Sequence, residues 1–325
     1  MLMTAAAHTP VLLDRVVALV ADAPDGIVVD GTVGAGGHAR EIVRARRERY
    51  GRAQLIGLDR DPAALELAAA ALADLDAEVE LVGTRFDALP QVLDDRGIDR
   101  VAAVFLDLGI SSMHVDRPER GFSYRHEGPL DMRMDPGLAL TADEIVNTWP
   151  RDGLVRVLRE YGEERFADRI ARAIEAARPL RSTTALAEVV RAAIPAAARR
   201  TGGHPATRTF QALRIAVNDE LAALDAVLPT LLDRLLPGGV AVVLSYHSLE
   251  DRRVKRAFAE AATGCICPPG LPVCGCGRTP AVTPLVRRPE RPDAAEIARN
   301  PRAASALLRA VRRVPEDRLP EEVSS

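Results

Sequence analysis

A glycine-rich loop between an apolar run and an amphipathic segment constrains this chain more than any other feature. The run Ile27–Val29 ends at Asp30, and the loop from Val28 to Ala39 reads VVDGTVGAGGHA. A strand, a glycine-rich turn and a helix in that order place backbone N–H groups where a nucleotide-like ligand can bind. Glycine suits this turn because a Cβ would block the ligand and because some turn positions need a positive φ. The loop therefore indicates an α/β domain that binds such a cofactor.

A second apolar run fits the same domain but leaves the identity of the cofactor open. Gln54–Leu58 ends at Asp59, 23 residues after Gly36, and a carboxylate there can accept hydrogen bonds from two ribose hydroxyls. The spacing of Gly34, Gly36 and Ala39 also matches the dinucleotide fingerprint. NAD and S-adenosylmethionine (SAM) both carry that ribose, so these residues alone allow either cofactor.

Composition limits the classes of protein that this chain can belong to. Its 325 residues are 47% hydrophobic, enough for one large core or two moderate ones. Asp14 and Arg15 interrupt the first apolar stretch, so we expect no leader and no membrane span, and a cytoplasmic protein. The net charge of −3 means that any binding of nucleic acid must use a local basic patch.

The apolar pattern predicts a parallel sheet interrupted by a helical insert. Strands are expected at 27–30, 54–59, 79–82, 101–107 and 240–246. Helices are expected at 37–49, 62–75, 141–148, 152–177 and 183–194, and along one apolar face from Phe210 to Leu228. We therefore expect a discontinuous α/β domain at 1–117 and 209–325, with an insert at 118–208. The tail from about residue 287 is expected to be an irregular extension outside the core, with at most a short helix at 305–311.

Acidic residues end three of the predicted strands. Asp30, Asp59 and Asp107 each close an apolar run, and Phe86 follows another. The carboxyl ends of parallel strands meet at one edge of a sheet, where ligands of doubly wound folds bind. Each aspartate could instead cap the next helix, but three such caps together are a weaker explanation than a nucleoside site.

Two polar residues that follow the resumed strand are candidates for chemistry at the same edge. Ser245 and His247 lie in the stretch SYHS directly after the apolar run. A single histidine is as often structural as catalytic, and both interpretations stay open for His247.

A basic stretch inside and after the insert is a candidate surface for phosphates. Residues 189–218 contain five arginines and one histidine but no acid. The candidate RNA-binding residues are Arg199, Arg200, His204, Arg208 and Arg214. Alternatively, these arginines pair with acids elsewhere. The aromatic content of 3% does not indicate extensive stacking on bases.

The four cysteines lie within 12 residues, among prolines and glycines. They are Cys265, Cys267, Cys274 and Cys276. Four thiolates on tight turns suit a tetrahedral structural zinc site, although the C-x-C spacing is shorter than the common one. The alternative is free thiols, since disulfides are rare in a reducing cytosol.

These residues and several longer stretches closely resemble the RsmH (MraW) family of bacterial methyltransferases of small-subunit rRNA. The matching stretches are HTPVLLD at 8–14, DGTVGAGGHAREI at 30–42, IGLDRDP at 56–62, LDLGISS at 106–112, ERGFSYRHEGPLDMRMD at 119–135, YGEERFADRIARAI at 161–174, HPATRTFQALRIAVNDEL at 204–221 and SYHSLEDRRVK at 245–255. They occur in order over nearly the whole chain.

The resemblance implies a class I SAM-dependent methyltransferase sheet that carries a helical substrate-recognition insert. It implies methylation of N4 of a cytidine in the decoding region of 16S rRNA, with the small ribosomal subunit as partner. The residues implied to bind SAM are Gly36, Gly37, His38, Asp59, Phe86, Asp107 and His114. Cysteine clusters occur in only some relatives, so zinc is not expected to be essential for the chemistry.

For the chemical step, Asp107 is the first candidate to accept a hydrogen bond from the cytosine amine, and Ser245 and His247 are second. Two other functions share parts of the pattern: an NAD-dependent dehydrogenase, and a non-catalytic, zinc-containing RNA-binding protein. The sequence leaves both a monomer and a homodimer possible.

Overall fold

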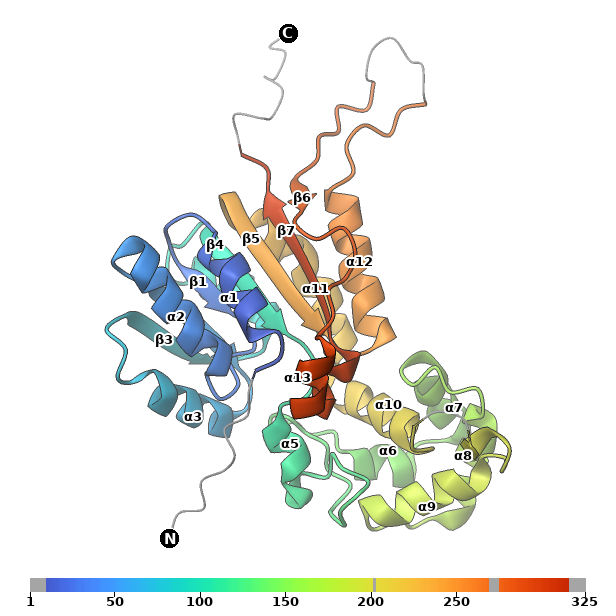
Figure 1. The fold of residues 1–325 in the computed structure, drawn as a ribbon. Helices are drawn as coiled ribbons and strands as arrows, with labels where there is room; N and C mark the ends of the chain where they lie inside the picture. The colour runs from blue at the N-terminus through green and yellow to red at the C-terminus, as the bar shows by residue number, and fades with distance from the viewer. Residues whose placement is uncertain (1–9, 201–202, 269–274, 316–325) are drawn as a thin grey trace. The chain divides into compact units, whose positions relative to one another are not determined.

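The protein divides into two compact units, which we describe separately. The computed structural model describes residues 10–200, 203–268 and 275–315. One unit contains the described residues up to Gly109 and from Ala223 onward, and the other is Ile110–Ala222 (Figure 1). The second unit is wider than the predicted insert at 118–208, because Phe210 and Leu213 pack into its core rather than into that of the first unit.

Among the described residues, seven strands of the first unit form one mixed sheet in the order β3-β2-β1-β4-β5-β7-β6. The strands are β1 (Val28–Asp30), β2 (Gln54–Asp59), β3 (Glu78–Gly83), β4 (Val101–Asp107), β5 (Leu235–Ser245), β6 (Val282–Pro284) and β7 (Leu307–Arg313). The first five strands are parallel to one another, whereas β7 is antiparallel to both β5 and β6. The predicted α/β sheet is confirmed, but it is not wholly parallel.

Helices cover both faces of this sheet because its central strands are apolar on both sides. Along β4, Phe105 packs into one core cluster, whereas Val104 and Leu106 pack into the other, as the two-residue period of a strand requires. The first cluster includes residues of α1 (Leu13–Ala21), α2 (Gly37–Tyr50) and α3 (Pro62–Leu72); the second includes residues of α4 (Leu89–Asp94), α11 (Glu220–Asp233) and α12 (Ser248–Ala261). A short helix, α13 (Ala294–Arg299), precedes β7.

The prediction for the tail was wrong. Residues 307–313 are neither helical nor irregular but form β7, a core strand between β5 and β6. Leu308 and Ala310 pack with the first cluster and Val311 with the second. The pairing with β5 and β6 selects a strand here, and a local pattern of three or four apolar residues does not reveal that pairing.

Two long predicted helices are each broken in the structure. The apolar face from Phe210 to Leu228 spans α10 (Thr207–Asn218) and α11, because Asp219 has a φ of 52° between them. The predicted helix at 152–177 likewise divides into α7 (Arg151–Glu160) and α8 (Ala167–Ala177). In the second case, the backbone turns at Glu163, which has a φ of 47°. Side-chain periodicity continues across such breaks, so it does not detect them.

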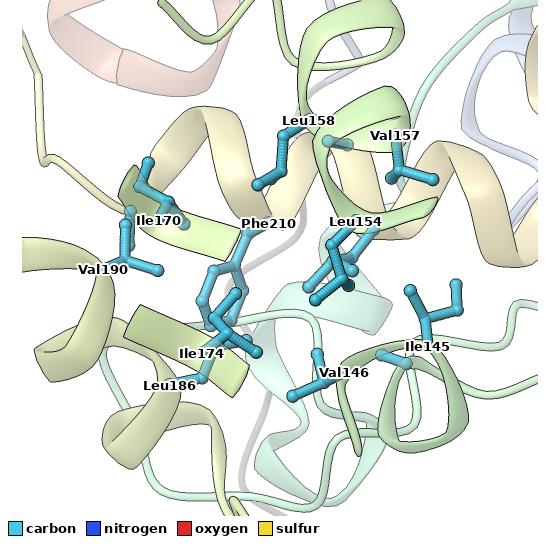
Figure 2. Packing of buried hydrophobic residues seen from close by; sticks show 14 of the residues in the cluster. Ile145, Val146, Leu154, Val157, Leu158, Ile170, Ile174, Leu186, Val190 and Phe210 are labelled. Carbon is cyan, nitrogen blue, oxygen red and sulfur yellow. The ribbon is translucent and has the colours of Figure 1, made fainter. Parts of the chain in front are cut away.

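The second unit has helices but no strand among its described residues, and it has a core of its own. Its helices are α5 (Ser112–Asp116), α6 (Ala142–Thr148), α7, α8, α9 (Thr183–Ala193) and α10. Leucine, isoleucine and valine side chains from α6 to α9 surround Phe210 of α10 (Figure 2). A separate core makes this unit a folded body rather than an extended loop.

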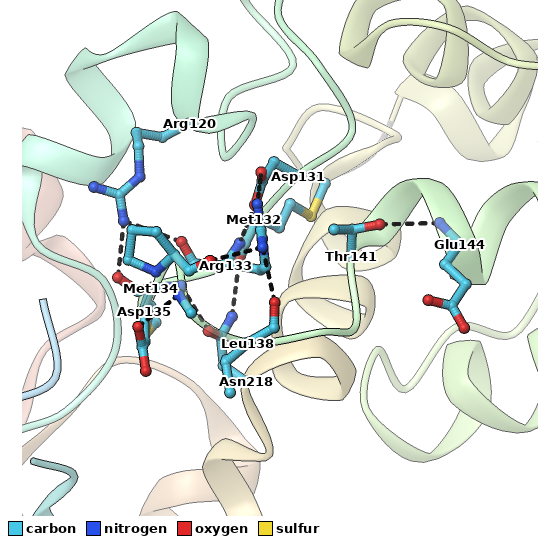
Figure 3. A network of polar contacts seen from close by, with 12 residues as sticks. Arg120, Asp131, Met132, Arg133, Met134, Asp135, Leu138, Thr141, Glu144 and Asn218 are labelled. Carbon is cyan, nitrogen blue, oxygen red and sulfur yellow. Dashed lines mark hydrogen bonds and ion pairs between the residues drawn. The ribbon is translucent and has the colours of Figure 1, made fainter.

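Polar contacts hold the glycine- and proline-rich stretch at 119–136 in place within the second unit. The carboxamide of Asn218 on α10 accepts a hydrogen bond from the N–H of Met134 and donates one to the carbonyl of Met132 (Figure 3). Arg133 donates to Asp131 and to the carbonyl of Leu138. These contacts satisfy backbone groups that no helix or strand would satisfy.

Within the described part of the chain, no helix has the length and apolar character needed to cross a membrane.

Candidate active site

Three carboxylates lie at the carboxyl ends of three adjacent strands. Asp30 ends β1, Asp59 ends β2 and Asp107 ends β4, and β1 lies between the other two strands. The predicted meeting of these strand ends at one edge of the sheet is therefore confirmed. Asp30 is 1% exposed, and its burial, together with repulsion from Asp107 and Asp59, raises its pKa to about 8. Asp30 is therefore mostly protonated at neutral pH.

Asp30 and Asp59 stabilise loops rather than capping helices. Oδ1 of Asp30 accepts a hydrogen bond of 3.1 Å from the N–H of Thr32. The carboxylate of Asp59 accepts hydrogen bonds from the N–H groups of Gly34 (3.0 Å) and Asp61 (2.9 Å). The residue that caps α3 is Asp61, whose own carboxylate accepts from a backbone N–H of that helix. The capping interpretation therefore does not account for Asp30 or Asp59.

Asp107 lies in a network of side chains from three segments of the first unit. The hydroxyl of Tyr246 donates a hydrogen bond of 2.8 Å to Oδ1 of Asp107, and Nδ1 of His38 is 3.6 Å from Oδ2. The backbone N–H of Asp107 donates to Oγ1 of Thr32 at 2.6 Å. His38 is fixed from its other side, since Nε2 is 2.9 Å from the carbonyl oxygen of Val11. The position of the Asp107 carboxylate is thus set by its neighbours.

Tyr246 is suited to remain a neutral donor in this network. Burial raises the pKa of its phenol well above the ordinary value, and the adjacent charge of Asp107 raises it further. Its ring lies against Gly109, where a Cβ would be 3.4 Å from Cδ2 of the ring. The sequence interpretation missed this residue, although it lies between the candidates Ser245 and His247, directly after β5.

The glycine-rich loop adopts the conformation that its sequence predicts. Gly36 precedes the first residue of α2 with a φ of 81°, and its N–H donates to the carbonyl of Val33. At Gly31, a Cβ would be 2.5 Å from a side-chain carbon of Leu106 and 3.3 Å from Cβ of Phe86. Gly31 therefore allows the loop to pass closely over β4 and beside Phe86.

Ser245 and His247 both have structural contacts. Ser245 is buried, and its hydroxyl lies 3.4 Å from the carbonyl of Leu307, its partner on β7. His247 caps α12: its Nδ1 accepts from the N–H of Glu250, whose side chain accepts from the N–H of His247 in return. These contacts explain both residue types without a chemical role.

His114 and Arg214 lie in the second unit. His114 on α5 is 5% exposed, and its ring stacks on that of Phe122 with 4.9 Å between the ring centroids. Arg214 forms a two-point ion pair with Glu220, with N–O distances of 2.8 and 2.9 Å. For Arg214, the alternative of pairing with an acid is therefore the correct one.

Other members of the basic set are placed differently. His204 and Arg208 are exposed, and Arg199 is half-buried. Nη1 of Arg208 donates to the backbone carbonyl of Glu163. A carbonyl is neutral, so this contact does not neutralise the charge of Arg208. The side chain of Arg200 lies outside the described part of the structure.

Three cysteine thiols converge in the first unit. The sulfurs of Cys265, Cys267 and Cys276 lie within 4.8 Å of one another, and those of Cys265 and Cys276 are 3.7 Å apart. A disulfide would require about 2.05 Å, whereas two ligands of a tetrahedral zinc ion with Zn–S bonds of about 2.3 Å lie about 3.8 Å apart. The arrangement thus fits a thiolate zinc site. Cys274, the fourth expected ligand, lies outside the described residues.

Comparison with known proteins identifies the family. The model of the MraW methylase family matches residues 5–314. The chain belongs to the MraW methylase family. A relative from Acidothermus cellulolyticus is 56% identical over 97% of this chain and 96% of its own length. A relative from Heliobacterium modesticaldum is 50% identical over 94% of this chain and 98% of its own length. One from Thermobifida fusca is 52% identical over 96% of this chain and 95% of its own length. All three are named ribosomal RNA small subunit methyltransferase H.

Membership in the MraW methylase family confirms the resemblance read from the sequence. The α/β sheet is the class I methyltransferase fold that this resemblance implies. The family match also removes the support for a dehydrogenase or a non-catalytic RNA-binding protein, since the glycine loop and Asp59 are shared by NAD and SAM enzymes but the family is one of methylases.

Proposed function

We propose that this chain transfers a methyl group from SAM to N4 of a cytidine in the decoding region of 16S rRNA, within the small ribosomal subunit. The proposal is supported by its family and by the names of relatives that match almost their full length. The observation that carries it is the carboxylate of Asp107, held at the end of β4 by Tyr246. A ribosomal substrate also favours a cytoplasmic location.

SAM is proposed to bind at the carboxyl edge of β1, β2 and β4. The donors and acceptors there fit it: Asp59 can accept from ribose hydroxyls, Phe86 can flank the adenine, and the backbone from Gly36 to His38 offers the N-terminus of α2. His114 is the implied further contact. When bound, SAM supplies a methyl group that is already activated on a sulfonium.

Asp107 is proposed to accept a hydrogen bond from the exocyclic amine of the cytosine. That amine is a weak nucleophile because its lone pair is delocalised into the ring, and an adjacent carboxylate stabilises the positive charge that develops on it. Tyr246 and His38 act as positioning residues, since they hold the carboxylate from two sides. We give Ser245 and His247 no role in the reaction, because β7 and the cap of α12 account for them.

The helical unit is proposed to bind the RNA around the target. A target base must leave its stack to reach an enzyme site, and contacts to flanking phosphates give position rather than base identity. Arg199, His204 and Arg208 are retained for this role, with Arg200 as a sequence-based candidate. Arg214 is omitted because Glu220 compensates its charge.

Zinc is proposed to bind Cys265, Cys267 and Cys276, with Cys274 as the fourth ligand. The sulfur–sulfur distance of 3.7 Å and the N–H of Ile266, which donates to the sulfur of Cys276 at 3.4 Å, support a metal site on a tight turn. The ion would stabilise the loop after α12 and would take no part in methyl transfer.

The proposed function is tested by methyl transfer to purified small subunits that lack the modification. The protein is incubated with isotopically labelled SAM, and the rRNA is digested and its nucleosides are analysed by mass spectrometry. We expect label on N4 of one cytidine in the decoding region. Naked 16S rRNA serves as the comparison substrate. Label on another atom or another nucleoside, or none at all, would refute the proposal.

A further inference from the structure

An exposed histidine stacks on a tyrosine in the second unit. The rings of His204 and Tyr124 are nearly parallel, with 10° between their planes and 4.3 Å between their centroids. His204 precedes α10, whereas Tyr124 belongs to the glycine- and proline-rich stretch at 119–136, before α6. The two residues are 80 positions apart, so the folded unit is required to bring them together.

The tyrosine beneath this histidine is fixed. Its ring meets the buried ring of Phe210 edge-on, with 5.4 Å between centroids and 82° between planes. Its hydroxyl lies 3.2 Å from Oγ1 of Thr207. Tyr124 is therefore attached both to the core of the unit and to the first residue of α10, and it provides a rigid support.

The imidazole is also oriented, although it is exposed. Nδ1 of His204 accepts a hydrogen bond of 3.2 Å from the N–H of Ala206. Tyr124 covers one face of the ring, and the residue nonetheless remains exposed. A flat ring that is ordered before any ligand binds loses little conformational freedom when a second flat group stacks on it.

The charge around this pair favours an anionic partner such as RNA over an apolar one. Arg208 on α10 and Arg125, next to Tyr124 in sequence, are both exposed. The nearby carboxylate of Glu188 is paired with Arg191, which holds its pKa below the ordinary value. A planar stacking surface beside exposed arginines is the combination that binds unpaired nucleotides.

We propose that His204, supported by Tyr124, is a stacking platform for one unpaired base of the RNA substrate. The inference rests on the proposed function and deepens it, because it assigns to His204 a base contact rather than a phosphate contact. The low aromatic content of the chain did not indicate such a site. One histidine in the right place provides it, since stacking needs a flat ring and not an aromatic-rich sequence.

The experiment compares three variants of His204. His204→Phe keeps an aromatic ring, His204→Lys has a positive charge without a ring, and His204→Ala has neither. The probes are short single-stranded RNAs with the decoding-region sequence, each carrying 2-aminopurine in place of one base. Stacking quenches this fluorophore, and titration gives the Kd. We expect His204→Phe to retain the quenching at one position and to bind within about 3-fold of the wild type. His204→Ala and His204→Lys should lose it and bind roughly 5- to 100-fold more weakly.

Opposite results would overturn the proposal. If His204→Lys binds as the wild type does and His204→Phe does not, the contact is ionic and the platform does not exist. Equal binding by all four proteins also refutes it. Tyr124→Phe is the matched control: it keeps the ring and loses only the contact to Thr207, so it should retain quenching. Thermal unfolding monitored by circular dichroism identifies any variant whose second unit does not fold.

A second readout distinguishes this proposal from the function on which it rests. In methyl transfer to small subunits, His204→Ala should raise KM with little change in kcat, because it removes binding and leaves the reacting groups intact. Quenching by a wild-type protein that methylates nothing would refute the proposed function alone. Normal methylation with an unchanged KM in His204→Ala would refute the platform alone.

Discussion

The hydroxyl of Tyr246 donates a hydrogen bond of 2.8 Å to Oδ1 of Asp107 and so joins the ends of two neighbouring strands, β5 and β4. Because the phenol is buried and stays protonated, it directs one oxygen of the carboxylate and leaves the other on the side of His38. This single contact connects the sheet to the chemistry that we propose for Asp107.

Tyr246→Phe should lower kcat roughly 10- to 100-fold, because a hydrogen bond to a charged group contributes about 1.5–3 kcal/mol and the phenylalanine ring still fills the space against Gly109. The Kd of SAM, measured by calorimetry, should change much less. Tyr50→Phe is the control, since its hydroxyl donates only to the carbonyl of Ala23. An unchanged kcat in Tyr246→Phe would show that Asp107 needs no positioning.

Asp107→Asn should lower kcat by at least roughly 100-fold, since the amide keeps the size of the carboxylate but not its charge. Single-turnover rates at saturating SAM separate this effect from any loss of cofactor binding. Asp87→Asn removes a carboxylate that follows β3 and is paired with Arg85, and it should have a much smaller effect on the rate. A similar loss in both variants would mean that only the net charge of the region matters.

Asp30 should make the stability of the protein dependent on pH. Its pKa is about 8 in the folded state and about 3.9 when unfolded, so between these values the folded state binds a proton that the unfolded state does not. The free energy of unfolding should therefore fall as the pH rises from about 4 to 8. Asp30→Asn keeps an acceptor for the N–H of Thr32 and should flatten this slope.

Urea unfolding at pH 5, 6.5 and 8 would measure the effect of Asp30. Asp14→Asn, which alters an exposed carboxyl on α1, is the control and should follow the wild type. Parallel curves for Asp30→Asn and the wild type would mean that Asp30 is ionised in the folded protein throughout this range.

Cys276→Ser should abolish stoichiometric zinc binding, because the sulfur of Cys276 is one of the three that converge. Metal content is measured by mass spectrometry on protein purified without chelator, and the thiols are titrated before and after a chelator is added. About one zinc per chain is expected for the wild type. Wild-type protein without zinc, whose thiols react freely, would support the alternative of free cysteines.

Much of the site could be predicted from sequence because its residues mark the ends of strands. Asp30, Asp59 and Asp107 stop continuous apolar runs, and the rule for parallel sheets then places them at one edge. Tyr246 was missed because hydroxyl and imidazole groups beside it appeared better suited to chemistry. Its role depends on the distance to Asp107, 139 positions earlier, and no local pattern contains that information.

The errors in the fold have the same origin. The strand at 307–313 is selected by its partners β5 and β6 rather than by its own residues. The breaks at Glu163 and Asp219 are single backbone conformations that leave the apolar period intact. Local sequence therefore predicted where apolar segments occur, and tertiary pairing decided what some of them became.

The place of β7 in the sheet has a consequence for synthesis of the chain. The outer edge of β5 is completed by residues about 60 positions further on, since Ser245 pairs with Leu307. While a nascent chain has emerged only as far as β5, this apolar strand presents unpaired N–H and C=O groups that favour association with other chains. The helical unit, whose residues all precede β5, has by then emerged with its own core. All residues of the second unit are thus synthesised before the strand that completes the edge of β5.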